Sequence, residues 1–259
     1  MIGLLRYMWN DNKRKYIVSF LVFILIIGIL FAQMNMKLTS VTSTKQLVLF
    51  MSIFTLYICG IIISFIQVIS IFPKLLRNPL VRLSTISGKQ LVMGMIFLLT
   101  AVMFIWDVIG TSIFYISLQF AIPSSELFTA LRELADVTIT DHILSSVIEM
   151  IKIQSIMIQI LFLIVVMKIF TRKKKIQVML IIVSFLILNT VLKGIYVALG
   201  KLTPSFTFIK KIIYSSGDGL DIGMYAGSNI NIYNMGFACL VCIVGMYLTA
   251  HIINKKLEV

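Results

Sequence analysis

The sequence predicts an all-α integral membrane protein with six transmembrane helices and both chain ends in the cytoplasm. Hydrophobic residues make up 59% of its 259 residues and charged residues only 13%, whereas soluble domains are about 45–50% apolar and about 25% charged. The apolar residues also gather into runs long enough to cross a bilayer, which takes about 20 residues in a helix. Basic residues lie mainly between alternate runs, which indicates the orientation.

Six apolar runs bounded by charge meet this length requirement, and we expect each of them to form one helix. They cover residues 16–34, 47–72, 91–120, 153–170, 176–200 and 233–253. The third run is longer than one crossing needs, so its helix should tilt, kink or extend beyond the bilayer. We expect residues 1–259 to form a single transmembrane domain.

The distribution of Lys and Arg predicts which segments are cytoplasmic. Short cytoplasmic loops retain basic residues, and most of the Lys and Arg lie in residues 1–15, 73–90, 171–175 and 254–259. The opposite loops hold slightly more acidic than basic residues. A nucleic-acid surface would gather its charge on one face, so this spread argues against nucleic acid as a partner. It favours contact with anionic lipid and a multi-pass protein of the cytoplasmic membrane.

The N-terminal residues 1–12 precede the first span and have near-helical apolar spacing. Leu4, Leu5, Met8 and Trp9 carry this pattern, which is typical of an interfacial helix lying along the inner leaflet with Trp9 at headgroup depth. A frayed coil is the alternative. The first apolar run is longer than the core of a secretory signal, and no A-x-A site follows it, so we expect the span to be retained.

The predicted cytoplasmic loop 73–90 is longer than a tight turn and has regularly spaced apolar and basic residues. Pro73 and Pro79 interrupt it, and proline breaks a helix interior but is tolerated in a first turn. Between and around them, apolar and basic residues would give a short amphipathic helix that docks into a groove of a soluble partner. These residues are Lys74, Leu75, Leu76, Arg77, Leu80, Arg82 and Leu83. The alternative is a solvated loop whose charges only fix the orientation.

Two outer segments also show helical patterns. Residues 203–214 begin with Thr-Pro, a typical helix start, and continue with an apolar stripe of Phe206, Ile209 and Ile213. The stripe is too short to cross the membrane and too apolar for water, so we expect a re-entrant helix. Residues 124–136 form a second amphipathic segment, with leucines on one face.

Charged and amide side chains within the apolar runs are candidates for interhelical contacts. Asp107 and Lys193 both lie roughly 25 Å from the inner boundary at 1.5 Å per residue. They either pair, within one chain or across a dimer, or each extends to water at the outer end of its span. Gln67 and Asn189 are candidates for interhelical hydrogen bonds or a semi-polar pathway, with packing as the default.

The sequence lacks the motifs of common enzyme classes. It contains no G-x-x-x-x-G-K-[ST] phosphate loop and no G-x-S-x-G. Its two histidines are not part of an H-E-x-x-H, and the C-x-x-C of Cys239 and Cys242 lies inside an apolar run, where small buried hydrophobes are the better interpretation. We therefore expect no catalytic residue, metal site or cofactor in this chain.

The combination resembles the permease subunits of type-2 ABC exporters over nearly the whole chain. The shared features are an interfacial helix (MIGLLRYMWN), six spans with both ends inside, a coupling helix between the second and third spans (FPKLLRNPLVRL), and outer re-entrant helices (TPSFTFIKKIIY). The resemblance implies a half-transporter. Two permease chains, identical or paralogous, form the pathway, and separate ATPase subunits that hold ATP and Mg bind the coupling helices and drive export.

The narrower likeness is to small permeases that export amphipathic peptides, including the phenol-soluble modulin and lantibiotic-immunity exporters. A lipid or a drug-like molecule is an alternative substrate. Two other functions stay open: a non-transporting immunity or sensor protein that binds a toxin, and a stand-alone small-solute carrier subunit or membrane-embedded enzyme. The last would need a cluster of intramembrane acids or histidines, whereas Asp107 is nearly isolated.

Overall fold

The computed structural model describes residues 2–35, 43–78, 86–120, 139–171, 173–202, 214–215, 221–222 and 232–256. The helices in these residues are α1 (Ile2–Asn35), α2 (Ser43–Leu75), α4 (Gly88–Phe120), α6 (Ile139–Phe170), α7 (Lys174–Leu202) and α8 (Ile232–Lys256). Two strands, β1 (Tyr214–Ser215) and β2 (Asp221–Ile222), pair antiparallel. Each helix contains a stretch long and apolar enough to cross a membrane. The prediction of six helices of transmembrane length and apolarity is therefore confirmed.

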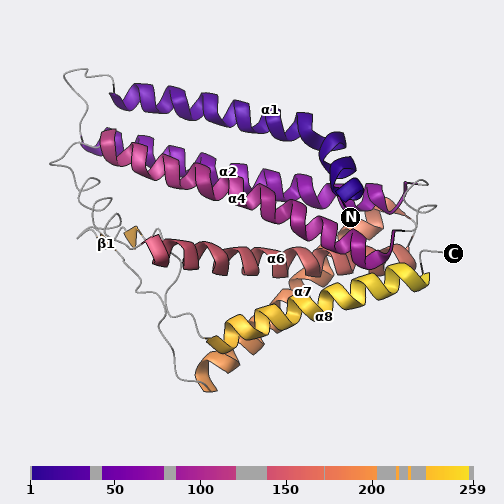
Figure 1. Cartoon of the computed structure of the whole chain (residues 1–259). Coiled ribbons are helices and arrows are strands. Elements are labelled where there is room, and N and C mark those ends of the chain that lie inside the picture. Colours follow the sequence, from indigo (N-terminus) through magenta and orange to yellow (C-terminus); the bar gives the residue numbers. More distant parts are fainter. Residues whose placement is uncertain are drawn as a thin grey trace.

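Consecutive helices run in alternating directions, so both chain termini lie at the same end of the bundle (Figure 1). We call this the terminal end. The C-terminal end of α2 and the start of α4, and the C-terminal end of α6 and the start of α7, lie at this end as well. The arrangement therefore brings together basic residues from several helices, including Lys74, Lys89, Lys174 and Lys255.

The first helix is longer than its apolar run. The sequence predicts an interfacial helix over residues 1–12 that is separate from the first span, whereas α1 is continuous from Ile2 to Asn35. Figure 1 shows a bend near its N-terminal end. Asn12 is buried, and its Nδ2 donates to the Met8 carbonyl at 3.1 Å, a local bond of the kind that bends helices. Whether the first turns lie along a leaflet stays a prediction.

The fourth helix also starts earlier than its apolar run, at Ile139 rather than at residue 153. The added turns contain Ile148, which is buried. They also contain a salt bridge in which Lys152 Nζ lies 2.6 Å from Glu149 Oε1. Oppositely charged side chains three residues apart stabilise a helix. α6 therefore continues through residues 139–152, which are more polar than the predicted span 153–170.

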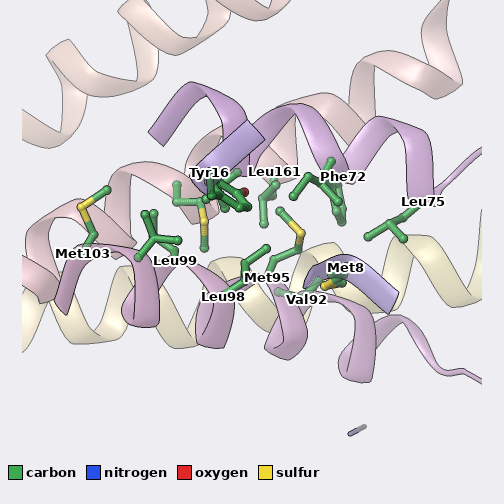
Figure 2. Packing of buried hydrophobic residues seen from close by; sticks show 14 of the residues in the cluster. Met8, Tyr16, Phe72, Leu75, Val92, Met95, Leu98, Leu99, Met103 and Leu161 are labelled. Carbon is green, nitrogen blue, oxygen red and sulfur yellow. The ribbon is translucent and has the colours of Figure 1, made fainter. Parts of the chain in front are cut away.

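The core lies between α1, α2, α4 and α6. α4 packs against α1, α2, α6 and α8, and α6 packs against α2, α4, α7 and α8, so these two helices are the central ones. Figure 2 shows side chains from the core helices packing together. The labelled residues are Met8, Tyr16, Phe72, Leu75, Val92, Met95, Leu98, Leu99, Met103 and Leu161. α7 differs, since it contacts α6 and α8 while no residue of its span Lys174–Lys201 is buried.

Trp106 of α4 occupies the middle of the packing between α1, α2 and α4. It is the largest fully buried side chain among the described residues, at 1% exposure. Its Nε1 donates to Ser64 Oγ of α2 at 2.8 Å. The ring centroids of Phe20, Phe23 and Tyr57 lie 5.2, 4.7 and 5.8 Å from that of Trp106. One side chain therefore joins three helices.

Glycines create the space for two of these aromatic side chains. A Cβ at Gly60 would lie 2.8 Å from Cζ2 and Cζ3 of Trp106, closer than real Cβ contacts come. A Cβ at Gly110 would lie 2.5 Å from the Tyr57 hydroxyl, which itself donates to the Trp106 carbonyl at 3.2 Å. Small residues that let helices approach closely are typical of membrane helix pairs. The α2–α4 contact therefore requires glycine at both positions.

Candidate functional site

The segment between α2 and α4 contains the predicted coupling residues, and its first turn is held tightly. α2 includes Pro73 in its last turn and ends at Leu75. Proline lacks the N–H that continues a helix. Beyond it, the amides of Arg77 and Asn78 donate to carbonyls three residues earlier, at 3.1 and 3.2 Å. These 3₁₀-type bonds satisfy carbonyls that the end of an α-helix leaves without partners.

Lys168 of α6 binds the same turn. Its Nζ donates to the Leu76 carbonyl at 3.0 Å, and the lysine is half-buried. The carbonyl groups at a helix C-terminus carry partial negative charge, so a cation placed there is stabilising. The end of α2 is thereby bonded to a helix that lies far away in the sequence.

The N-terminal turns of α1 reach the same segment from the other side. Asn78 Nδ2 donates to the Tyr7 hydroxyl at 2.7 Å. Leu4, about one turn before Tyr7, and Met8, the next residue, are buried, and their side-chain ends would lie 3.3 Å from a Cβ at Gly94 of α4. The first turns of α1 therefore brace the start of the segment against α4.

The four residues predicted for the interfacial helix have different surroundings. Leu4 and Met8 pack inside the bundle, Leu5 is half-buried, and Trp9 is 39% exposed. The Trp9 ring stacks on that of Tyr16 at 6.0 Å. Trp9 is thus the member of this group whose exposure fits a place at the membrane surface.

The end of the segment is fixed by a capping box and by α8. Ser87 Oγ accepts from the Gln90 amide at 3.3 Å, and Gln90 Oε1 accepts from the Ser87 amide at 3.1 Å. This reciprocal pair satisfies two amides at the start of α4. The Gly88 amide donates to Asn254 Oδ1 of α8 at 2.7 Å. The S-x-x-Q spacing of Ser87 and Gln90 is a signal in the sequence from which this helix start could be predicted.

Gly88 allows α4 and α8 to approach at this point. A Cβ there would lie 2.7 Å from the Ala250 carbonyl oxygen and 2.9 Å from Ile253 Cβ. We expect Gly88→Ala to lower the free energy of unfolding by about 1 kcal/mol, since α4 must shift away from a backbone atom. Unfolding in mixed micelles measures this. Gly94→Ala is the control, because it meets only flexible side-chain ends at 3.3 Å, and an equal loss in both variants would contradict the contact.

The predicted coupling residues divide into two groups. Lys74 and Arg77 are exposed at the terminal end, whereas Leu75 and Leu76 are 2% and 6% exposed in the core. The last turn of α2 packs against α6, so its leucines stabilise the bundle and are not available to a soluble partner. The remaining predicted residues, Leu80, Arg82 and Leu83, lie outside the described residues.

Asp107 lies inside the apolar span Gly88–Ser117 of α4. The Ser146 hydroxyl donates to Asp107 Oδ1 at 2.9 Å, and Ser146 is the residue at which the apolar span of α6 begins. This end of α6 is opposite the terminal end. Whether Asp107 extends to water at the outer end of its span stays a prediction.

Lys193 and Asn189 are both exposed on α7. They are four residues apart, so they lie on the same side of that helix. Within this chain Lys193 does not pair with Asp107, because the only salt bridge in the described part of the chain joins Lys152 and Glu149. A pair across two chains stays a prediction.

Amide side chains join helices inside the bundle. Gln67 Nε2 donates to Ser19 Oγ at 3.1 Å, which links α2 to α1. Gln154 Nε2 donates to Thr100 Oγ1 at 2.5 Å, which links α6 to α4. These bonds match the packing role that is the default for amides in membrane helices.

The remaining predictions concern the two outer segments and metal binding. Phe206, Ile209, Ile213 and the segment 124–136 lie outside the described residues. Within the ranges that the structure does describe, no three His, Cys, Asp or Glu side chains gather as metal ligands would. The bonds at the terminal end join the end of α2 and the start of α4 to other helices. Such an arrangement can transmit a movement of these helix ends to the rest of the bundle.

Comparison with protein families, with curated proteins and with solved structures gives no match to this chain.

Proposed function

We propose that this chain is the permease half of an ATP-driven ABC exporter of the cytoplasmic membrane. The observation that carries the proposal is the attachment of the end of α2 and the start of α4. Leu76 and Asn78, which follow α2, are bonded to α6 and α1, and Gly88, the first residue of α4, is bonded to α8. The distribution of basic residues predicts that residues 73–90 face the cytoplasm. A soluble partner that moves these helix ends would therefore move several spans.

The partner in this proposal is an ATP-binding cassette subunit. This chain has no phosphate loop of its own, so ATP and Mg would be held by the partner. Lys74 and Arg77, both exposed, offer it positive charge, and a complementary acidic groove would favour docking. The partner's affinity for the loop has to differ between its nucleotide states, since only differential affinity shifts a conformational equilibrium.

A second permease copy, identical or paralogous, completes the transporter. The span of α7 has no fully buried residue, so the face that does not contact α6 and α8 is left for contact with lipid or with another chain. Asn189 and Lys193 add polar groups to that surface, and such groups in a membrane helix usually have partners. The proposed substrate is an amphipathic peptide, a lipid or a drug-like molecule moved out of the cell.

The proposal is tested by ATP hydrolysis in the purified complex. The full chain is extracted from its native membrane in mild detergent, and the eluate should hydrolyse ATP in a vanadate-sensitive manner. Arg77→Glu combined with Arg82→Glu should lower the co-purified ATPase about tenfold or more, because two repulsive charges at the contact cost more than the 1.4 kcal/mol that a tenfold change requires.

The matched control reverses two other charges at the terminal end, with Lys173→Glu just before α7 and Lys175→Glu in its first turn, both exposed. This variant should retain the ATPase. Protease accessibility of a tag in each variant confirms that the orientation is unchanged. An eluate of the wild-type chain without ATPase activity would contradict the proposal and favour the toxin-binding or stand-alone alternatives.

A further inference from the structure

We infer that Lys168 is a positioning residue that ties the C-terminal end of α2 to α6, so that movement of this helix end is transmitted across the bundle. Its role in transport rests on the proposed function, whereas the tie itself is a property of this chain alone.

The inference begins with how the helices are grouped. α1, α2 and α4 pack against one another, and so do α6, α7 and α8; contacts of α4 and α2 with α6 and α8 join the two groups (Figure 1). Residues 76–87 join α2 to α4, two helices of the first group. The Lys168 bond to Leu76 and the Asn254 bond to Gly88 each cross to the second group, one directly after α2 and one at the first residue of α4.

The two crossing bonds differ in strength. Asn254 is an exposed neutral acceptor, whereas Lys168 is a half-buried cation bonded to the carbonyl end of α2. A charged donor forms a stronger hydrogen bond than a neutral one, and more so where water is partly excluded. Buried residues of both groups surround this point, including Leu76 and Val165. Lys168 is therefore the firmer of the two attachments.

The place of Lys168 in α6 also distinguishes it from lysines that only set the orientation. It lies inside the apolar span Ser146–Phe170, whereas Lys173, Lys174 and Lys175 follow that span and are exposed. A charge that served orientation alone would be solvated at lower cost among these three. The bond to Leu76 supplies a reason for the charge at residue 168.

The tie is tested by the distance between α2 and α6 in the chain alone. Spin labels are placed at Ser70→Cys on α2 and Phe170→Cys on α6, both exposed, after the native cysteines Cys59, Cys239 and Cys242 are replaced by alanine. In lipid nanodiscs the labelled chain should give one narrow distance distribution. Lys168→Met, which keeps the length of the side chain without its charge, should lose that narrow distribution.

Two variants separate the tie from general damage to the bundle. Lys168→Arg retains a cation and should restore the narrow distribution, and Lys173→Met should not change it. If Lys168→Met does not give a monodisperse protein, Lys168→Gln, which removes the charge and shortens the side chain, is measured in its place. An unchanged distribution in the charge-free variant would overturn the inference.

The transmission itself is measured with the co-purified ATPase. ATP and vanadate should shift the distance in the wild-type chain and in Lys173→Met, but not in Lys168→Met, although ATP hydrolysis persists. A shift in Lys168→Met equal to that of the wild type would overturn the role in transmission. If no ATPase accompanies the wild-type chain, the proposed function fails, and the nanodisc distances still decide whether the tie exists.

Discussion

Trp106→Ala is expected to lower the free energy of unfolding by about 3–5 kcal/mol, the range for truncating a large buried aromatic residue. The substitution removes a ring that is 1% exposed and that contacts Phe20, Phe23 and Tyr57. It also leaves Ser64 Oγ without the donor that lies 2.8 Å away. The cavity would lie between three helices, where lipid chains do not reach.

Unfolding of the purified chain in mixed micelles measures this loss. Phe104→Ala is the matched control, since Phe104 lies on the same helix and is 60% exposed. Lipid or detergent fills the space that an exposed ring leaves, so we expect a small effect. Equal losses in the two variants would show that Trp106 is not at the centre of the packing.

Gly60→Ala should lower the free energy of unfolding by about 1–3 kcal/mol through overpacking, although alanine is the better helix former by about 1 kcal/mol. The added Cβ would overlap the Trp106 ring, and the surrounding rings leave the indole no room to move. Gly28→Ala is the control, because nothing lies within 4 Å of a Cβ there and the free energy of unfolding should not fall. It should be neutral or slightly stabilising.

A double-mutant cycle isolates the contact between these two residues. Once Trp106 is alanine, the methyl group of Gly60→Ala has no ring to meet. The second substitution should then cost little, so the two effects should be far from additive, as expected for residues in direct contact. Additive losses would contradict the packing of α2 on α4 described here.

The number and nature of the helices could be predicted from the sequence because apolar length is a strong signal. The ends of α4, α7 and α8 lie within about three residues of the predicted runs, whereas the starts of α1 and α6 lie well before them. The N-terminal half of α6 contains Glu149 and Lys152, so the predicted run began only after these charges. The first turns of α1 could be predicted as helical from Leu4 and Met8, but spacing does not indicate whether an apolar face meets lipid or another helix.

The same limit applies to loop 76–87. Leu75 and Leu76 lie between Lys74 and Arg77 in a pattern that predicts partner binding. They are nevertheless buried, because the bundle covers the end of α2. The bond from Lys168 to a backbone carbonyl depends on where two distant helices lie, and no local pattern encodes it. The capping box of Ser87 and Gln90, in contrast, is a local signal that sequence reasoning can find.

The exposure of α7 separates two kinds of mutational effect in this chain. The exposed apolar side chains of α7, such as Met179 and Leu186, contribute little to internal packing. Ile181, in contrast, packs against the core, and the ring of Tyr196 lies 5.1 Å from that of Phe237. Substitutions at the exposed positions should leave the stability of the isolated chain nearly unchanged. One that abolishes activity would thus report a surface recognised from outside the chain, which makes the exposed face of α7 the most direct place to map an external contact.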